Sequence, residues 1–503
     1  MLKLLKNLSK REWIFAFICL LLIISQVWLE LKMPDYMSEI TKLVQTEGSK
    51  MQDILINGAY MLACALGSLV SAIIVGYFVS SISSTFSMRV RKKIFDKVGN
   101  LSMHEVKGFS VSSLITRTTN DVTQVEILIG MGLQLMIKAP ITAVWAITKI
   151  LNKGWQWSLA TAIAVVILLS VMISIMVIVV PRFKRVQKLV DKLNAVTREN
   201  LTGIRVVRAF NAEKYQEDKF SKANNDLTDL LIFNQKKFAL MQPIMYLVMQ
   251  SLALSIYFIG AYLIKEALII DKLTIFGDMI VFSSYSMQVI MSFLMLVIIF
   301  MMLPRADVSA KRINEVLESK ISVKEGDKTE GKEGVKGEVE FKNVSFIYAD
   351  SEEDLLSNIS FKANKGETVA FIGATGSGKS SLVNLIPRYY DVTSGEVLVD
   401  GINVKEYKFE ALNNKIGYVS QKAVIFDGSV KENISYGESG NGDVSEEKIM
   451  QAARVARAND FIEKMEEGYD SHIASRWNKL IRWSKAESVY CKSYSQRPRN
   501  IYF

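Results

Sequence analysis

Cysteine and histidine are scarce in this chain, which has three cysteines and two histidines in 503 residues. Cys19, Cys64 and Cys491 are too few for a disulfide framework, and the first two lie in long apolar runs. His104 and His472 lie far apart in the sequence and form no cluster with cysteine, so a zinc site is not expected. These shortages exclude small disulfide-stapled domains and zinc-organised domains.

Most of the excess positive charge lies in one segment. The formal net charge is +10, but residues 475–503 contain seven basic residues and one acidic residue. The rest of the chain has 54 basic and 50 acidic residues. Because the basic character is local, we expect no nucleic-acid partner. The hydrophobic share of 50% excludes an intrinsically disordered chain.

Long hydrophobic runs, in contrast, fill the first 304 residues. A helix needs about 20 predominantly apolar residues to cross the hydrocarbon core of a lipid bilayer. Lys138 alone interrupts the third run, and we expect it to face the bundle interior or a hydrated cavity, with snorkelling to an interface as the alternative. Six spans are predicted, at about residues 13–33, 55–88, 127–148, 155–181, 238–264 and 279–304.

Lysine and arginine define the orientation of these spans. They cluster before the first span and after the second, fourth and sixth, which all lie on one side. By the positive-inside rule that side is cytoplasmic, so the sequence predicts a multi-pass protein of the cytoplasmic membrane with a cytoplasmic N-terminus. The cytoplasmic segments at about 89–126 and 182–237 are long and rich in helix formers, and we expect helical stalks there. A signal peptide is the alternative for the first run, but no convincing cleavage site follows it.

The chain changes character after the sixth span. Residues 318–337 are highly charged and contain four glycines, which is typical of a linker. Short β-rich runs follow, and Thr368–Ile372 is predicted to be a strand. A second domain that is soluble and cytoplasmic is therefore expected to begin near residue 338.

A glycine-rich motif follows this predicted strand directly and matches G-x-x-x-x-G-K-[ST]. Its backbone N–H groups can surround phosphates, the lysine can neutralise the β- and γ-phosphates, and the last hydroxyl can ligate Mg²⁺. The alternative, a glycine-rich turn with a chance lysine, does not explain the strand–loop–helix setting. The predicted site for ATP and Mg²⁺ consists of Gly373, Ala374, Thr375, Gly376, Ser377, Gly378, Lys379 and Ser380, with Ser381 opening the helix that follows.

Six spans followed by such a domain resemble an ATP-binding cassette (ABC) exporter half-transporter of the multidrug or lipid-exporter type. The similarity covers about residue 10 to residue 474, and the order and spacing of its motifs make it specific. The segments that carry it, besides the glycine-rich motif, are Thr116–Val122, Glu199–Phe210, Phe341–Tyr348, Gly417–Gln421 and Phe426–Ile434.

The resemblance implies a fold and a mechanism. Residues 1–317 would form an all-α membrane domain of six helices, and residues 338–474 the N-terminal part of an α/β P-loop nucleotide-binding domain. Tyr348 would stack on the adenine, and Gln421 would reach the Mg²⁺. The chain would pair with a second half-transporter, identical or different. ATP bound between the two cassettes would drive export of a small hydrophobic or amphipathic molecule, a drug or a lipid, across the cytoplasmic membrane, with peptide as another cargo class.

The sequence departs from the family pattern after residue 474. The pattern calls for Q-G-G-x-N-L-S-G-G-Q, but residues 475–485 read S-R-W-N-K-L-I-R-W-S-K. A reading frame shifted by one base permits the family residues, and it forces glycine at Trp477–Asn478 and at Trp483–Ser484. We therefore predict that residues 475–503 are an aberrant, frameshifted tail, with a genuinely divergent basic tail as the alternative.

This departure affects the expected activity. Without the signature motif and the catalytic glutamate that follows it in the family, the chain as written is predicted to bind ATP without hydrolysing it. Three other functions stay open: an inactive pseudogene product, a non-catalytic partner subunit, and an importer or regulator that uses ATP only as a signal. The cargo is not readable from the sequence.

Overall fold

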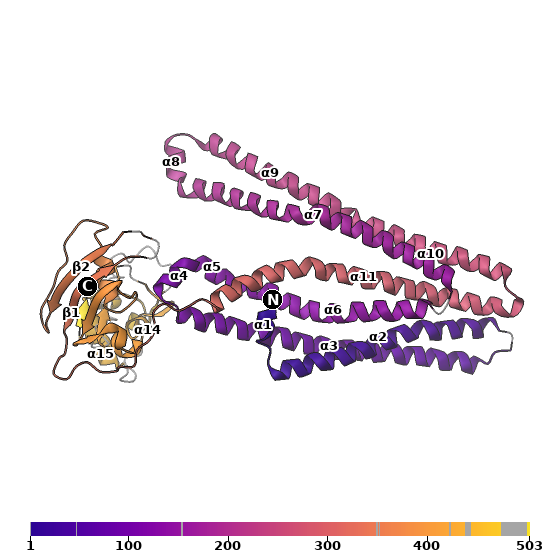
Figure 1. Cartoon of the computed structure of the whole chain (residues 1–503), viewed down its shortest axis with the longest axis horizontal. Coiled ribbons are helices and arrows are strands. Elements are labelled where there is room, and N and C mark those ends of the chain that lie inside the picture. Colours follow the sequence, from indigo (N-terminus) through magenta and orange to yellow (C-terminus); the bar gives the residue numbers. More distant parts are fainter. Residues whose placement is uncertain are drawn as a thin grey trace. The chain divides into compact units, whose positions relative to one another are not determined.

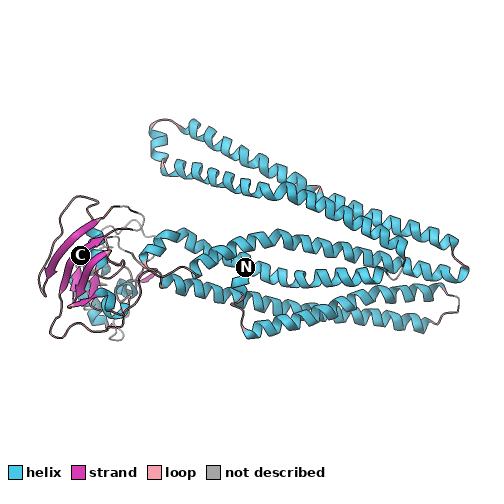
Figure 2. Ribbon diagram, in the orientation of Figure 1, coloured by secondary structure: helices cyan, strands magenta, loops and turns pink. Residues whose placement is uncertain are grey.

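The computed structural model describes residues 2–46, 48–151, 154–348, 351, 353–421, 424–437, 444–473 and 500–502. The chain divides into two compact units. The first contains Met1–Lys92 and Arg117–Asn314, and the second contains Lys93–Thr116 and Glu315–Phe503. Among the described residues, strands occur only in the second unit (Figure 2).

The described part of the first unit is helical throughout (Figure 1). Six stretches are long and apolar enough to cross a membrane, which confirms the six predicted apolar helices. The helices are α1 (Leu2–Leu5), α2 (Lys10–Gln45), α3 (Met51–Gly99), a π-helical turn (Arg117–Asp121), α6 (Val122–Leu151), α7 (Trp155–Thr202), α8 (Ile204–Ala209), α9 (Glu213–Ala239), α10 (Met241–Glu266) and α11 (Ile269–Leu317).

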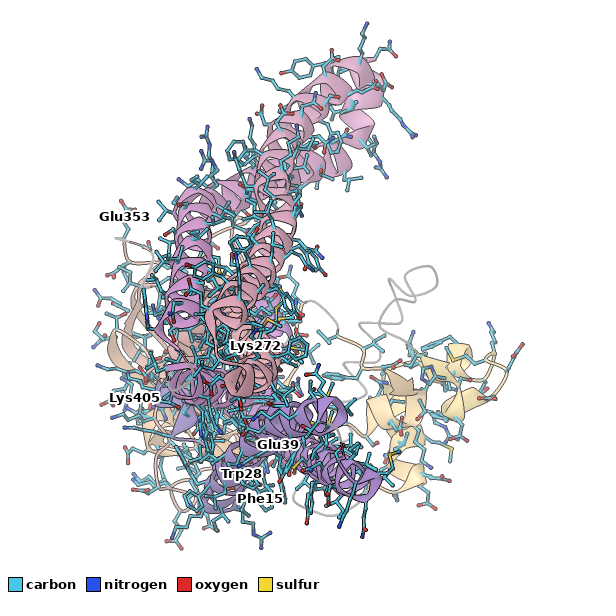
Figure 3. The ribbon with its side chains drawn as sticks, turned by 90° about the vertical axis from the view of Figure 1, so that its right-hand side faces the viewer. Phe15, Trp28, Glu39, Lys272, Glu353 and Lys405 are labelled. Carbon is cyan, nitrogen blue, oxygen red and sulfur yellow. The ribbon has the colours of Figure 1, made fainter. Side chains whose placement is uncertain are left out.

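Helix α2 has one face that packs inside the helical bundle and another that remains exposed on its surface. Its N-cap is Ser9, which forms a reciprocal capping box with Glu12. One face buries Ile23 and Val27, which are four residues apart and lie next to each other on a helix. On the same helix Trp13 is 59% exposed and Trp28, labelled in Figure 3, is 46% exposed. Large apolar side chains left uncovered in this way suit contact with lipid tails.

Lys138 lies inside the bundle, as one of the two predicted placements requires. Its Nζ donates to Glu30 Oε1 of α2 at 2.8 Å, and the side chains are 18% and 24% exposed. Gln26 and Ser68 donate to the same carboxylate oxygen, at 2.9 and 3.2 Å. The ion pair neutralises a charge that is costly in a membrane, so the snorkelling alternative is not what the structure shows.

Long helices continue beyond the predicted spans, as expected for cytoplasmic stalks. Helix α7 extends to Thr202, well past the predicted end of the fourth span at residue 181, and pairs with α9 over one part of its length and with α10 over the other (Figure 1). Lys219 donates to Glu199 at 2.7 Å and joins the two helices near their shared end. The short helix α8 connects them there.

The second unit combines a small sheet with short helices. Its main sheet has the order β2-β1-β3-β4, and all of its neighbouring strands are antiparallel. Strand β1 is central, and Val339 lies opposite both Ala363 and Val399. The strands are β1 (Val339–Phe346), β2 (Leu356–Ala363), β3 (Ser394–Val399), β4 (Ile402–Asn403), β5 (Ile416–Tyr418), β6 (Gly428–Ser429), β7 (His472–Ile473) and β8 (Asn500–Tyr502).

Short helices surround these strands. The apolar core of the sheet includes Phe341, Leu385 and Tyr407, which come from β1, a helix and a loop. Packing these elements together places the glycine-rich loop beside the core. The helices are α4 (Met103–Phe109), α5 (Val111–Thr116), α12 (Lys379–Leu385), α13 (Phe409–Asn413), α14 (Val430–Ile434), α15 (Glu446–Val455) and α16 (Asn459–Ile462), with 3₁₀ turns at Val404–Glu406 and Gly468–Asp470.

One predicted strand is wrong. Thr368–Ile372 is not part of a strand, and no strand among the described residues pairs with it. Val369, Phe371 and Ile372 are 41%, 38% and 97% exposed. A segment of this composition becomes a strand only when a neighbour accepts and donates its backbone hydrogen bonds, and β-rich composition does not supply that neighbour.

The predicted linker, residues 318–337, has no helix or strand of its own but is bound to the second domain. The amide of Gly326 donates to Tyr407 O at 3.0 Å, and the amide of Lys328 donates to Glu406 O at 2.9 Å. A Cβ at position 326 would lie 2.3 Å from the carbonyl carbon of Glu406, so only glycine permits this approach.

The predicted tail lies outside the described residues except for Asn500–Tyr502. That segment forms β8, which pairs in parallel with β5, with Ile416 opposite Asn500 and Tyr418 opposite Tyr502.

Candidate functional site

The glycine-rich segment turns sharply before α12. Gly376 and Gly378 have φ of +88° and +89°, in the left-handed region that side chains disfavour. The amide of Ser377 donates to Ala374 O at 3.2 Å and closes the turn. The helix expected to open at Ser381 is present as α12, and it begins two residues earlier, at Lys379. The loop therefore presents backbone N–H groups at a helix start, where anions bind.

Lys379 lies across this loop. Its Nζ donates to the carbonyl oxygens of Gly373 and Ala374, at 2.8 and 2.7 Å, and contacts Ser377 Oγ at 3.4 Å. An ammonium held by weak neutral acceptors can exchange them for phosphate oxygens. This arrangement fits the phosphates of a nucleoside triphosphate.

Ser380 follows Lys379 on α12 and is exposed. No group of three or more histidine, cysteine or acidic side chains able to hold a metal occurs in the described part of the chain. Mg²⁺ in phosphate sites takes few protein ligands and keeps water and phosphate oxygens, so one serine hydroxyl is compatible with its chemistry.

Tyr348 is brought to the same helix, two residues after the end of β1. Its hydroxyl lies 2.8 Å from Ser381 Oγ, and Ser381 itself is buried. Tyr390 packs perpendicular to Tyr348, with ring centroids 5.3 Å apart. The structure thus joins the predicted adenine-stacking residue to the first turn of α12.

Gln421 is only indirectly connected to this helix. Tyr418 ends strand β5 and donates its hydroxyl to Asn384 Oδ1 of α12 at 2.8 Å. Burial raises the pKa of Tyr418 and of its neighbour Tyr389, so both phenols stay neutral. Gln421 follows three residues later and is exposed, and no hydrogen bond joins it to Ser380 in the described structure.

Sequence reasoning missed two residues beside Tyr348, namely Lys107 and Tyr390. The Lys107 ammonium lies 4.9 Å from the centroid of the Tyr348 ring. Lys107 comes from α4, more than two hundred residues earlier, and nothing in its local sequence indicates a nucleotide site. Tyr390 follows another tyrosine after α12, and this aromatic pair was the available signal.

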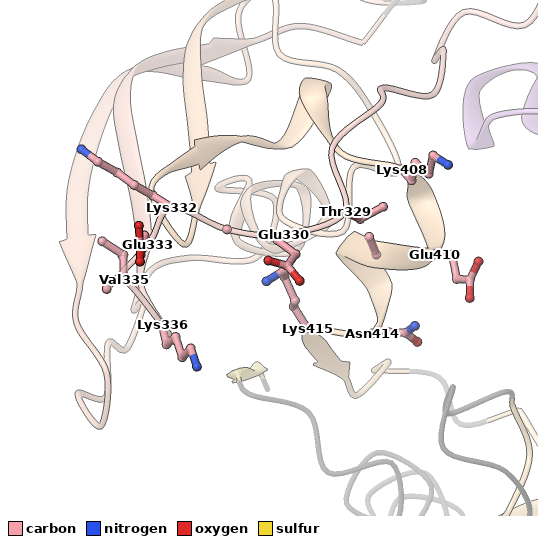
Figure 4. A pocket seen from close by; sticks show the side chains of 13 residues that line it. Thr329, Glu330, Lys332, Glu333, Val335, Lys336, Lys408, Glu410, Asn414 and Lys415 are labelled. Carbon is pink, nitrogen blue, oxygen red and sulfur yellow. The ribbon is translucent and has the colours of Figure 1, made fainter.

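A separate hollow of about 820 Å³ lies in the second unit, between residues 329–336 and residues 408–415 (Figure 4). Lys415 is one of its lining residues, and the Nζ of Lys415 pairs with the fully buried Asp400 at 3.0 Å. None of the predicted site residues lines it. The hollow is therefore distinct from the glycine-rich loop.

Two protein-family models match the chain. The ABC transporter transmembrane region matches residues 16–293, and the ABC transporter domain matches residues 356–482. The second match includes the glycine-rich loop and ends inside the segment predicted to be a tail.

Similar proteins have the same two-part organisation. The uncharacterised ABC transporter ATP-binding protein YfiB of Bacillus subtilis is 31% identical over 499 residues, which cover 96% of this chain and 83% of that protein. The putative multidrug export ATP-binding/permease protein YgaD of Bacillus subtilis is 29% identical and covers 84% of this chain and 71% of its own length. The ATP-dependent lipid A-core flippase of Syntrophus aciditrophicus is 27% identical and covers 80% and 66%.

A solved structure has the same fold. The structure of a bacterial Atm1-family ABC exporter with ATP bound superimposes with a TM-score of 0.75 at 20% identity, and the match covers 98% of this chain and 85% of that one. Together with the transmembrane match over more than half of the chain, this makes the protein a multi-pass membrane protein with a cytoplasmic nucleotide-binding domain. The chain belongs to the ABC transporter family, as an exporter-type chain that joins one transmembrane region to one nucleotide-binding domain.

Proposed function

We propose that this chain is one half of a dimeric exporter that moves a small hydrophobic or amphipathic molecule, a drug or a lipid, across the cytoplasmic membrane with ATP. The observation that carries the proposal is the glycine-rich loop at the start of α12, with the Lys379 ammonium placed within it, in a chain with six apolar helices. One chain therefore contains both the groups that would bind phosphate and the helices that would cross the membrane.

The nucleotide site works through this chain's own groups. Lys379 neutralises the β- and γ-phosphates, and backbone N–H groups of the loop from Gly373 to Gly378 donate to them. Ser380 ligates Mg²⁺, which supplies charge neutralisation when bound. Tyr348 stacks on the adenine, and its hydrogen bond with Ser381 fixes the distance from base to phosphate. Gln421, in the loop after β5, would provide a further oxygen ligand for Mg²⁺.

In this proposal a second chain pairs with this one to form the complete exporter. The end of the α7–α9 pair supports it, because apolar side chains there are strongly exposed: Val206 is 60% and Phe210 is 78% exposed. This end belongs to a cytoplasmic stalk rather than to a lipid-facing span, so we expect a surface of the second chain to bind there and bury these side chains. Whether the partner is identical to this chain or a different half-transporter stays open.

The cargo class rests on the nature of the spans and on the relatives. Two similar proteins are named for multidrug export and for lipid A-core flipping, and both activities concern amphipathic molecules. The bundle core of this chain contains apolar and aromatic side chains such as Trp157, Phe282 and Tyr285. These side chains are buried against one another, so the cargo class rests mainly on the relatives, and peptide cargo is the alternative.

The chain as written binds ATP but does not hydrolyse it in this proposal. Residues 475–485 do not contain L-S-G-G-Q, the motif that the family places against the partner's ATP. The same observation favours the second candidate function, a non-catalytic partner subunit or an inactive gene product.

The test compares two versions of the protein in inside-out membrane vesicles. In the first, the chain is used as written; in the second, the reading frame is restored by one base at codon 475. We expect ATP-dependent uptake of a fluorescent amphipathic dye only with the second version, and its loss on Lys379→Ala. Uptake that persists in Lys379→Ala would refute the export proposal, and ATP-dependent uptake by the chain as written would refute its catalytic incompetence.

A further inference from the structure

Helix α4 and the nucleotide-binding domain belong to one compact unit, although they are far apart in the sequence. Ser102 and Glu105 form a capping box at the start of α4. Glu105 also accepts a hydrogen bond from the amide of Ser322 at 3.2 Å, and Ser102 Oγ lies 3.0 Å from Ser322 Oγ. This short helix is thereby fixed to the segment that follows α11.

Lys107 extends from α4 to an aromatic pair of the nucleotide site. Its Nζ lies 4.9 Å from the centroid of Tyr348 and 5.4 Å from that of Tyr390. The two rings are perpendicular to each other. An ammonium within about 6 Å of an aromatic face is attracted by the electron-rich ring, so Lys107 makes this contact with both rings.

The core of the domain covers one side of the Tyr348 ring. Phe346 is 3% and Tyr390 is 8% exposed, and they meet Tyr348 at steep angles of 79° and 90°. Lys107 is itself exposed, and its ammonium lies over the Tyr348 ring. Because the core leaves only part of the ring accessible, an adenine stacked on Tyr348 and the ammonium would require the same part of the ring.

We propose that Lys107 is a positioning residue that competes with the adenine of ATP for the Tyr348 ring. When the base stacks, the ammonium leaves the aromatic pair, and α4 loses its contact with the nucleotide site. Since α4 follows directly after α3, which contains the second apolar span, this exchange ties base binding to the membrane helices. The inference rests on the proposed function, because it requires ATP to bind at this site.

The competition should change the affinity for a ligand that carries the base and leave the affinity for phosphates without a base unchanged. Replacing Lys107 by methionine removes the charge and keeps the length of the side chain. We expect Lys107→Met to bind MgATP about two- to fivefold more tightly, as an exposed cation–aromatic contact of ordinary strength implies. Inorganic triphosphate with Mg²⁺, which has no base, should bind equally well to both forms. Lys107→Arg keeps the cation and should bind MgATP like the native chain.

The experiment is a double-mutant cycle by titration calorimetry on the full chain in lipid nanodiscs. Lys107→Met is measured in the native background and in Tyr348→Leu, where its effect on MgATP should vanish. Unchanged or weaker MgATP binding in Lys107→Met, or an equal gain for triphosphate, overturns the competition even though ATP binds. Absence of any binding that depends on Lys379 overturns the proposed nucleotide site together with this inference.

Discussion

Removal of one charge from the Glu30–Lys138 pair should destabilise the transmembrane region strongly. Lys138 Nζ lies 2.8 Å from Glu30 Oε1, and both side chains are largely buried. At an effective dielectric constant of about 20, two unit charges at that distance attract each other by about 6 kcal/mol. Loss of water around both groups offsets much of this attraction. Removing only one partner leaves the other charge uncompensated, and this costs about 3–5 kcal/mol.

The assay is reversible unfolding of the chain in detergent micelles, followed by tryptophan fluorescence. We expect Lys138→Met and Glu30→Gln each to lower the free energy of unfolding by about 3–5 kcal/mol. The double variant should recover most of that loss, because no charge is left unpaired. Lys311→Met is the matched control, because Lys311 pairs with Asp307 at 3.0 Å but is 70% exposed. This variant should lower the free energy of unfolding by about 1 kcal/mol or less.

Two results would refute this reasoning. One is a cost for Lys138→Met no larger than that for Lys311→Met. The other is a double variant as unstable as the sum of the two single variants, which would mean that the two residues act independently.

Three further predictions concern the cytoplasmic part and the gene. Tyr348→Ala should weaken MgATP binding by about 1–3 kcal/mol in a calorimetric titration, because base stacking is lost, whereas Tyr348→Phe keeps the ring; equal losses would contradict stacking. Burial opposes ionisation of Glu105, but hydrogen bonds from Ser102 and Ser322 outweigh it and lower its pKa below 4.5. The stabilisation from Glu105 is therefore complete above about pH 4.5 and is lost as the pH falls through the lowered value, and the unfolding free energy of Glu105→Gln should lack this dependence. Resequencing codons 465–485 should reveal a one-base insertion or deletion, and an unchanged independent read would favour a genuinely divergent tail.

The sequence was sufficient for the parts of this protein that depend on local pattern. Runs of about 20 apolar residues have few structural alternatives, and the six apolar helices follow from them. The glycine-rich loop is equally local, because left-handed φ angles at Gly376 and Gly378 and the following helix are encoded within a few residues.

Features that depend on distant partners were not predictable. Glu30 became a candidate only when folding brought it to Lys138, and Lys107 only when α4 reached Tyr348. The opposite error occurred at Thr368–Ile372, where β-rich composition predicted a strand that has no partner among the described residues. Strand pairing and side-chain contacts across the sequence are tertiary properties, so propensity alone does not decide them.

Binding of MgATP to the purified full chain tests the central claim most directly. The native chain and Lys379→Ala are titrated with MgATP under the same conditions, and the release of phosphate is followed in both. The account predicts saturable binding to the native chain, loss of that binding in Lys379→Ala, and no phosphate release above the variant's background. Equal binding by both forms, or no binding by either, would contradict the assignment of the glycine-rich loop as the nucleotide site.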